Sequence, residues 1–276
     1  MTDLYAVIGN PIVQSKSPLI HAAFALATGQ DLRYSKLLGQ LGEFAADADV
    51  FRASGGRGMN VTMPFKLDAF AYATDLSERA RKAGAVNALK FQGGKVYGEN
   101  FDGVGLVNDI AHNLGHALTA KRVLLLGAGG AARGAVWPIL QEQPAHLVIA
   151  NRTVDKAQAI IADHPESYVL SASGYAQLQN PQAQPFDVVI NATSTGLQDD
   201  APPIAASVFA TGSLAYEMVY GKGLTGFLRL AKTTGHTQLA DGVGMLIEQA
   251  AEAFYWWRGV RPLTATMIKS MTVNLV

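Results

Sequence analysis

The stretch VLLLGAGGAARG, residues 123–134, places the strongest constraint on how this chain can fold. Its apolar start is typical of a buried strand, and it runs directly into Gly127, Gly129 and Ala132, which have the spacing G-x-G-x-x-A and open a helical pattern. Glycines there allow a tight turn and let backbone amides approach a pyrophosphate, which the positive end of the helix also attracts. The stretch predicts a dinucleotide-binding α/β domain; the alternative is a glycine-rich turn without a ligand.

The rest of the chain continues the α/β pattern. Short β-rich runs such as LYAVIGN, LRYSKLL and GMNVTM alternate with helical patterns before residue 104, and RVLLLG, HLVIAN, FDVVINAT and SLAYEMV do so after it. The segment ALKFQGGKVYGEN reads as a hairpin. A helix is predicted from Pro18 to Thr28, capped by Ser17 and ended by Gly29, and another near residues 41–53.

These patterns predict two α/β domains. A chain of 276 residues with 49% hydrophobic residues is long enough for both cores. We expect residues 1–104 and 243–276 to form a substrate-binding domain, to which the closing helices at 243–257 and 264–272 return. Residues 105–242 should form a Rossmann-type, doubly wound dinucleotide-binding domain.

Composition limits the classes of partner. Lysine plus arginine and aspartate plus glutamate number 22 each, so the excess positive charge that binds nucleic acid is absent. The sequence has no cysteine, no long apolar run of the kind that spans a membrane, and no signal-peptide pattern at its start. We therefore expect a cytoplasmic protein with small-molecule ligands and no nucleic-acid or membrane partner, acting as a monomer or homodimer.

The end of the second strand in the predicted dinucleotide domain indicates which cofactor is bound. NAD enzymes place an aspartate or glutamate there, against the ribose hydroxyls. This chain instead has NRTVDKA, in which Arg152 and Lys156 supply positive charge and Asn151 and Thr153 supply short hydrogen-bonding side chains. The pattern favours a binding site for the 2′-phosphate of NADP. The alternative is an ordinary helix start with a solvated arginine.

The first domain offers two groups suited to acid–base chemistry. If Pro64 opens a helix, Lys66 lies in its first turn, where the helix dipole disfavours a cation by roughly 0.3–1 kcal/mol. A lysine in such a place suggests a general acid or base, although surface lysines do occur there. Asp102, in the stretch NFDGVGL, is either the cap of the helix that follows or the partner of Lys66. The hydroxyls of Ser15 and Ser17 suit a carboxylate at the start of a helix.

Eight segments together resemble the shikimate dehydrogenase family over nearly the whole chain: GNPIVQSKSP, NVTMPFK, AGAVNAL, NFDGVGL, GAGGAARG, NRT, NATSTG and ADGVGMLIEQAAEAF. The resemblance implies reversible reduction of 3-dehydroshikimate to shikimate with NADPH, with Lys66 and Asp102 as the acid–base pair. It implies substrate contacts at Ser15, Ser17, Thr62, Asn87, Tyr220 and Gln249. The implied cofactor contacts are Gly127, Ala128, Gly129, Gly130, Ala131, Asn151, Arg152, Thr153, Lys156, Thr193, Met218, Gly242 and Met245.

Two positions depart from the pattern of this family. Phe101 and Ala88 stand where the family usually has threonine, and both are next to residues expected to bind the substrate. No metal is expected, because the six histidines show no ligand spacing and Lys66 already supplies a cation for the carbonyl.

Three other functions are compatible with parts of the sequence. A methylenetetrahydrofolate dehydrogenase would need stacking aromatic residues in place of the hydroxyl-binding set. An NAD-dependent quinate dehydrogenase differs in its preferred cofactor. A regulator that senses NADPH would keep the glycine-rich turn and Arg152, but it would not need Lys66 and Asp102 together.

Overall fold

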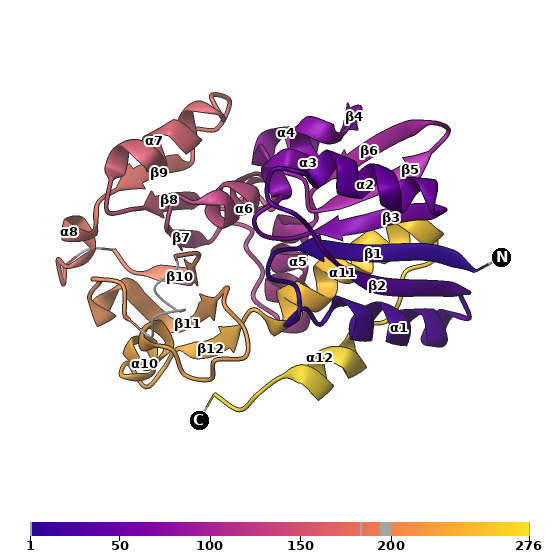
Figure 1. Ribbon diagram of the computed structural model, residues 1–276. Coiled ribbons are helices and arrows are strands. Elements are labelled where there is room, and N and C mark those ends of the chain that lie inside the picture. The colour runs from indigo at the N-terminus through magenta and orange to yellow at the C-terminus, as the bar shows by residue number, and fades with distance from the viewer. Residues whose placement is uncertain (1, 183, 194–199, 276) are drawn as a thin grey trace. The chain divides into compact units, whose positions relative to one another are not determined.

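The computed structural model describes residues 2–182, 184–193 and 200–275, and its chain forms two compact units (Figure 1). The first unit comprises Met1–Gly105 and Leu246–Met267, and the second comprises Leu106–Met245 and Ile268–Val276. The closing segment joins the second unit where partly buried Leu275 packs against one of its hydrophobic clusters. The assignment of substrate and cofactor to the two units stays a prediction.

The first unit is built on a six-stranded sheet with the order β2-β1-β3-β5-β6-β4. Strands β1, β2 and β3 are parallel, β5 is antiparallel to both β3 and β6, and β4 is parallel to β6. Its elements are β1 (Asp3–Gly9), α1 (Ser17–Thr28), β2 (Leu32–Leu38), α2 (Phe44–Ala53), β3 (Gly56–Val61), α3 (Lys66–Tyr72), β4 (Asp75–Leu76), α4 (Glu78–Ala83), β5 (Ala88–Gln92), β6 (Lys95–Glu99), and most of α11 (Val243–Arg258).

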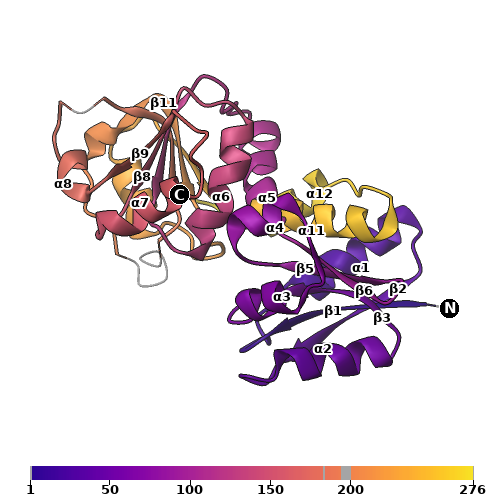
Figure 2. The same cartoon turned by 90° about the horizontal axis from the view of Figure 1, so that it is seen from above.

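Helices cover both faces of this sheet. Figure 2 shows α2 and α3 on one face and α1 with α11 on the other. Phe44 and Phe51 of α2 pack with Phe65 against the apolar side chains of β1 and β3, and Trp257 of α11 packs against Tyr5 on the opposite face. Burial of these large side chains is the main term that stabilises the unit.

The second unit has six parallel strands in the order β12-β11-β10-β7-β8-β9. Its elements are α5 (Asp102–Asn108), which begins in the first unit, the π-helical turn η1 (Asp109–Asn113), β7 (Arg122–Leu126), α6 (Gly130–Gln141), β8 (His146–Ala150), α7 (Val154–Ala162), β9 (Leu170–Ser173), α8 (Tyr175–Leu178), β10 (Phe186–Asn191), the 3-10 turn η2 (Ala206–Val208), β11 (Phe209–Glu217), α10 (Gly226–Lys232), β12 (Gln238–Asp241) and α12 (Ala265–Met271). Separate apolar clusters lie on the two faces, as expected for a doubly wound sheet. The predicted α/β class is confirmed.

Local predictions have mixed outcomes. The predicted hairpin is present as β5 and β6, joined through Gly93 and Gly94 at φ of 59° and 77°. The first helix ends at Gly29, which has φ of 65°. The helix predicted near residues 41–53 begins later, at Phe44, after Gly42 adopts φ of 83° and interrupts the helical path.

The prediction that Ser17 caps the first helix is wrong. The cap position is Lys16, whose side chain makes no capping hydrogen bond, and Ser17 is the first helical residue. The Ser17 backbone N–H donates to the Ser15 hydroxyl at 3.3 Å, so the neighbouring serine occupies this donor. The Ser17 hydroxyl is thereby left for other contacts.

Candidate active site

Six of the predicted catalytic and substrate-binding residues lie at one end of the strands in the sheet of the first unit. The carboxyl ends of β1, β3 and β6 lie at this end together with the amino end of β5, because β5 runs antiparallel to its neighbours. The loops at this end carry Ser15, Ser17, Thr62, Lys66, Asn87 and Asp102. Loops at the carboxyl ends of strands are where α/β folds commonly place their sites.

Lys66 and Asp102 form an ion pair at the centre of this group. The Lys66 Nζ donates to the Asp102 Oδ2 at 2.6 Å, and the two side chains are 33% and 21% exposed. Lys66 is the first residue of α3, as expected, so its ammonium group stands at the positive end of a short helix. The carboxylate of Asp102 offsets that unfavourable placement.

The second oxygen of Asp102 is occupied as well. The Asn87 Nδ2 donates to the Asp102 Oδ1 at 2.8 Å. Asp102 is the first residue of α5, and its own backbone N–H is occupied by Asn100, whose Oδ1 accepts from it at 3.1 Å. Both carboxylate oxygens therefore face the side chains of Lys66 and Asn87, and the capping alternative for the Asp102 side chain is not what the structure contains.

Asn87 is fixed from three directions. Its backbone N–H donates to the Glu99 carbonyl at 3.0 Å, and its own carbonyl accepts from the Val61 N–H at 2.8 Å. The Phe101 backbone N–H donates to the Asn87 Oδ1 at 2.8 Å, which turns the amide nitrogen toward Asp102. The same nitrogen lies 3.4 Å from the Oε1 of Gln249, which brings a residue of α11 into the group.

Three hydroxyl-bearing residues, Ser15, Ser17 and Thr62, follow β1 and β3 at the same end of the sheet. The Ser15 Oγ donates to the Ser17 Oγ at 3.2 Å, and Ser17 is 8% exposed. Thr62 is held by its backbone, which donates to the Ile8 carbonyl at 3.0 Å and accepts from the Phe65 N–H at 3.0 Å. Within the described part of the chain its hydroxyl has no hydrogen-bond partner, so it is available to a ligand.

The glycine-rich turn of the second unit has the geometry that phosphate binding needs. Gly127 has φ of 103°, and a Cβ there would lie 3.1 Å from the Ala192 carbonyl oxygen, so this position requires glycine. Helix α6 begins at Gly130, and its cap residue Gly129 supplies no side-chain hydrogen bond, which leaves backbone N–H groups at the helix start. A Cβ at either of these two glycines would meet open space, so a ligand can approach the backbone, and Ala128 and Ala131 lie in the same turn.

This turn lies at the point where the strand order reverses. Strand β7 leads into the turn, and β10 pairs with β7 on one side while β8 pairs with it on the other. Thr193 follows β10 and donates from its hydroxyl to the Asn191 Oδ1 at 2.6 Å. Residues 194–196 of the NATSTG segment lie outside the described residues.

The predicted phosphate-binding residues follow β8. The Asn151 Nδ2 donates to the Thr153 carbonyl at 2.8 Å, just before α7. Arg152 and Lys156 are exposed, and neither forms an ion pair with any residue that the structure describes. Two exposed cations near a helix start, with no ion pair to any described residue, suit an external anion.

Two buried carboxylates shape the loop after β11, which carries Met218 and Tyr220. Glu217 accepts from the Val219 N–H at 3.3 Å and Asp241 accepts from the Gly221 N–H at 3.1 Å. Burial raises the pKa of both carboxyls, while these hydrogen bonds act in the opposite direction. Tyr220 is 38% exposed, and desolvation raises the pKa of its phenol.

The start of α11 is anchored by close backbone packing. A Cβ on Gly242 would lie 2.2 Å from the Met218 carbonyl oxygen, so only glycine fits there. The Met245 N–H donates to the Tyr216 hydroxyl at 3.3 Å, and that hydroxyl donates to the Asp109 Oδ2 at 2.7 Å. Gly242 and Met245, both predicted cofactor contacts, thus have fixed positions beside the loop that carries Met218.

Comparison with known proteins adds three matching family models. Residues 7–89 match the shikimate dehydrogenase substrate binding domain, residues 109–198 match shikimate / quinate 5-dehydrogenase, and residues 242–272 match the shikimate 5'-dehydrogenase C-terminal domain. A protein of Nitrosospira multiformis called shikimate dehydrogenase (NADP(+)) is 53% identical over 275 residues, covering 100% of this chain and 99% of that protein. The chain belongs to the shikimate dehydrogenase family.

Solved structures agree with this family assignment. The crystal structure of an Ael1 enzyme from Pseudomonas putida has 54% sequence identity and a TM-score of 0.94, with 100% of both chains covered. The shikimate 5-dehydrogenase of Thermus thermophilus, in complex with NADP(H) and shikimate, has 30% identity and a TM-score of 0.86 over 98% of each chain. The predicted resemblance is confirmed, and with it the two-domain fold class.

The two departures from the shikimate dehydrogenase pattern fall in one buried cluster. Phe101 and Ala88 are 2% and 0% exposed and pack with Tyr5, Ala253 and Trp257. The Phe101 ring also lies 5.3 Å from the Arg79 guanidinium. The side chain of Phe101 therefore belongs to the core, while its backbone N–H holds Asn87.

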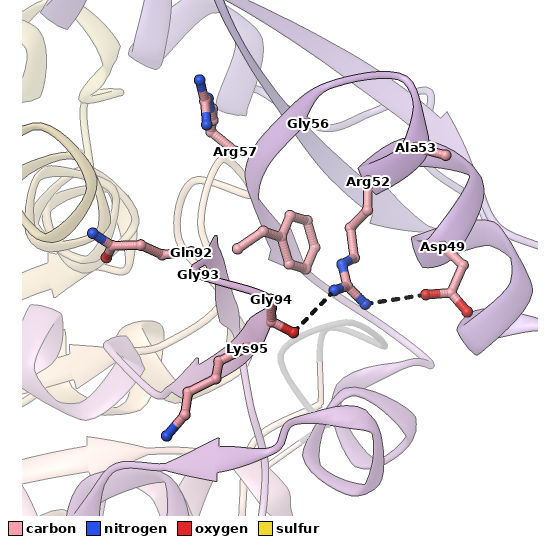
Figure 3. Close-up of a pocket in the computed structure, with 10 residues that line it drawn as sticks. Asp49, Arg52, Ala53, Gly56, Arg57, Gln92, Gly93, Gly94 and Lys95 are labelled. Atoms are coloured by element: carbon pink, nitrogen blue, oxygen red, sulfur yellow. Dashed lines mark hydrogen bonds and ion pairs between the residues drawn. The ribbon is translucent and has the colours of Figure 1, made fainter.

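A hollow in the same unit lies at the opposite end of β3 from Thr62 (Figure 3). It is lined by Asp49, Arg52, Ala53, Gly56, Arg57, Phe91, Gln92, Gly93, Gly94 and Lys95. Its cations already have partners: Arg52 pairs with Asp49 at 3.2 Å, and Lys95 pairs with Asp75 at 3.3 Å. Exposed ion pairs of this kind contribute little to the free energy of unfolding. None of the residues that line the hollow belongs to the segments that resemble the family.

Neither a metal cluster nor a membrane helix is found in the described part of the chain. No group of three histidine, cysteine, aspartate or glutamate side chains there could hold a metal ion. No helix among the same residues is long and apolar enough to cross a bilayer.

Two asparagines of the site were not predicted from the sequence. Asn100 accepts from the first backbone N–H of α5, and Asn60, which is 6% exposed within β3, donates from its Nδ2 to the Asn87 carbonyl at 3.3 Å. Asparagine is rare inside buried strands, so the asparagine in GMNVTM is the sequence feature from which the role of Asn60 could have been predicted.

Proposed function

We propose that this chain is a cytoplasmic enzyme that catalyses the reversible NADPH-dependent reduction of 3-dehydroshikimate to shikimate. The observation that carries the proposal is the Lys66–Asp102 pair at 2.6 Å, to which the Asn87 amide is hydrogen-bonded; Ser17 and Thr62 lie near the same end of the sheet. A proton donor beside several hydrogen-bonding groups suits a substrate that is a polyhydroxylated ketone. The family membership and the relatives named above support the same reaction.

The side chains have distinct roles in this proposal. As the ketone is reduced its oxygen gains negative charge, which the Lys66 ammonium stabilises and then protonates. In the oxidation direction Lys66 takes the proton back. Asp102 would keep the ammonium in place and accept from a neighbouring hydroxyl of the substrate, while Thr62 and Asn87 would hold ring hydroxyls. Ser15 and Ser17 would bind the carboxylate. Tyr220 and Gln249 are the further substrate contacts of the proposal.

The second unit suits NADP as the hydride carrier. NADPH supplies the hydride that reduces the ketone carbon when it is bound. The helix start at Gly129 and Gly130 would hold the pyrophosphate, and Arg152 with Lys156 would hold the 2′-phosphate. Thr193, Met218, Gly242 and Met245 are the proposed contacts to the nicotinamide side.

The proposed reaction is tested by a turnover assay with shikimate and, separately, quinate, each with NADP and NAD. We expect rapid reduction of NADP with shikimate and much slower turnover of the other three pairs. Faster turnover of quinate with NAD would instead identify a quinate dehydrogenase. Binding of NADPH without turnover of either acid would favour a regulator, and the proposal would be abandoned.

The cofactor preference should depend on two cations. Replacing Arg152 by leucine and Lys156 by alanine should weaken NADP binding tenfold to hundredfold relative to NAD, because charge-assisted hydrogen bonds contribute about 1.5–3 kcal/mol and only NADP has the phosphate. The measurement is KM for each cofactor. Lys232→Ala, which removes an exposed lysine from α10, is the matched control and should leave the ratio unchanged. An equal loss for both cofactors would contradict the assignment.

A further inference from the structure

Glu99, the last residue of β6, is a buried carboxylate to which neither the family resemblance nor the mechanism above gives a role. The residue is 6% exposed, and its two carboxylate oxygens accept four hydrogen bonds. The donors are Ser77, Arg79 and the backbone N–H of Asn100. Because a buried ion pair usually adds little stability over apolar side chains of the same volume, stability alone does not account for this one.

Helix α4 orients the Glu99 carboxylate. Arg79 donates from Nε to Oε1 at 3.1 Å and from Nη2 to Oε2 at 2.8 Å, so its planar guanidinium holds both oxygens at once. Ser77, the cap residue of α4, accepts from the Ala80 N–H at 3.0 Å and donates from its hydroxyl to the Glu99 Oε1 at 2.5 Å. These contacts fix the plane of the carboxylate.

The oriented carboxylate holds the turn that leads to Asp102. The Glu99 Oε1 accepts from the Asn100 N–H at 2.8 Å, and the Asn100 Oδ1 accepts from the Asp102 N–H at 3.1 Å. The Asn100 Nδ2 donates to the Ala85 carbonyl at 3.0 Å, which fixes which end of its amide faces Asp102. Two successive hydrogen bonds therefore lead from the Glu99 side chain to the backbone of Asp102.

The backbone of Glu99 holds the other neighbour of Asp102. Its carbonyl accepts from the Asn87 N–H at 3.0 Å, and the Asn87 Nδ2 donates to the Asp102 Oδ1 at 2.8 Å. Between them, the Phe101 N–H donates to the Asn87 Oδ1 at 2.8 Å, and the Phe101 ring lies 5.3 Å from the Arg79 guanidinium. One ion pair thus braces the whole turn from Glu99 to Asp102.

We propose that Glu99, oriented by Arg79, is a positioning residue for Asp102. It fixes the turn through Asn100 so that the Asp102 carboxylate meets Lys66. The inference rests on the proposed function, in which Lys66 and Asp102 are the acid–base pair. Because Glu99 acts through the turn and not on a ligand, its loss should slow the chemical step and leave KM for NADP nearly unchanged.

The test is Glu99→Gln, measured by steady-state kinetics with shikimate and NADP. An amide has one oxygen, so its nitrogen must face either Arg79 or the Asn100 N–H, and either arrangement loosens the turn. We expect kcat to fall about three- to thirtyfold, with KM for NADP within about twofold. Glu99→Ala removes both contacts at once and should lower kcat further.

Glu248→Gln is the matched control. Glu248 of α11 is also a buried carboxylate of the first unit that pairs with an arginine: it is 4% exposed and accepts from the Arg261 Nη2 at 2.9 Å. The control variant loses the same charge from a similar environment. Its melting temperature should fall about as much as that of Glu99→Gln, while its kcat stays at the parental value.

A double substitution separates positioning from general support of the fold. If Glu99 acts through Asp102, then Glu99→Gln should lower kcat no further once Asp102→Asn is present. Independent losses in the double variant, parental kcat in both Glu99 variants, an equal loss in Glu248→Gln, or a parallel rise in KM for NADP would overturn the inference while the parent still turns over shikimate. A parent without that turnover would overturn the proposed function and this inference with it.

Discussion

Replacement of Lys66 by alanine is expected to lower turnover of shikimate by roughly 10²- to 10⁴-fold, the range typical of a lost general acid and base. The 2.6 Å contact to Asp102 holds the ammonium on the carboxylate that also accepts from the Asn87 amide, which is proposed to hold the substrate. Without the Lys66 ammonium, the negative charge that develops on the ketone oxygen has neither a cation to stabilise it nor a proton donor. KM for shikimate should change much less than kcat, and steady-state kinetics in both directions measure the split.

The control for this variant is Lys95→Ala. Lys95 also forms an ion pair with an aspartate of the first unit, Asp75, at 3.3 Å, but these side chains are 57% and 40% exposed, and Lys95 lines the hollow of Figure 3. The Lys95→Ala variant should keep the turnover of the parent protein. Near-normal turnover of Lys66→Ala would rule out the acid–base role, whereas a collapse of its thermal melting would show that the loss of activity comes from unfolding.

The fold could be predicted because several local signals agree. The apolar run before Gly127, its G-x-G-x-x-A spacing and the apolar strands that follow are all consistent with one doubly wound sheet, and the structure has that sheet. Pro18 and Gly29 similarly marked the first helix within one residue. Such signals are local in sequence, and steric rules connect them directly to backbone geometry.

The sequence did not predict which side chains hold the site together. Ser17 reads as a helix cap by every local rule, yet a neighbouring hydroxyl two residues earlier takes the backbone donor. Asn60 and Tyr34 come from different strands, and their hydrogen bond exists only because β1, β2 and β3 are adjacent in the sheet. Contacts of this kind depend on tertiary packing, which overrides residue preference.

Asp102→Asn distinguishes the cap from the catalyst more sharply than any other single change. The two residue types cap helices about equally well, and the Asp102 N–H donates to Asn100 whichever side chain stands at position 102, so the start of α5 should be unaffected. The carboxylate accepts from Lys66 on one oxygen and from Asn87 on the other. An amide has only one oxygen, so its nitrogen must face one of these two donors.

We therefore expect Asp102→Asn to reduce turnover by at least about a hundredfold while the melting temperature falls by only a few degrees. Asn87 cannot turn to relieve the conflict, because the Phe101 N–H occupies its own oxygen at 2.8 Å. Lys66 would then lose both its counter-charge and its orientation. Asp75→Asn, in the exposed pair with Lys95, removes the same charge elsewhere and should keep full activity. Equal turnover in the two variants would show that Lys66 needs no carboxylate partner, and the proposed pair would have to be given up.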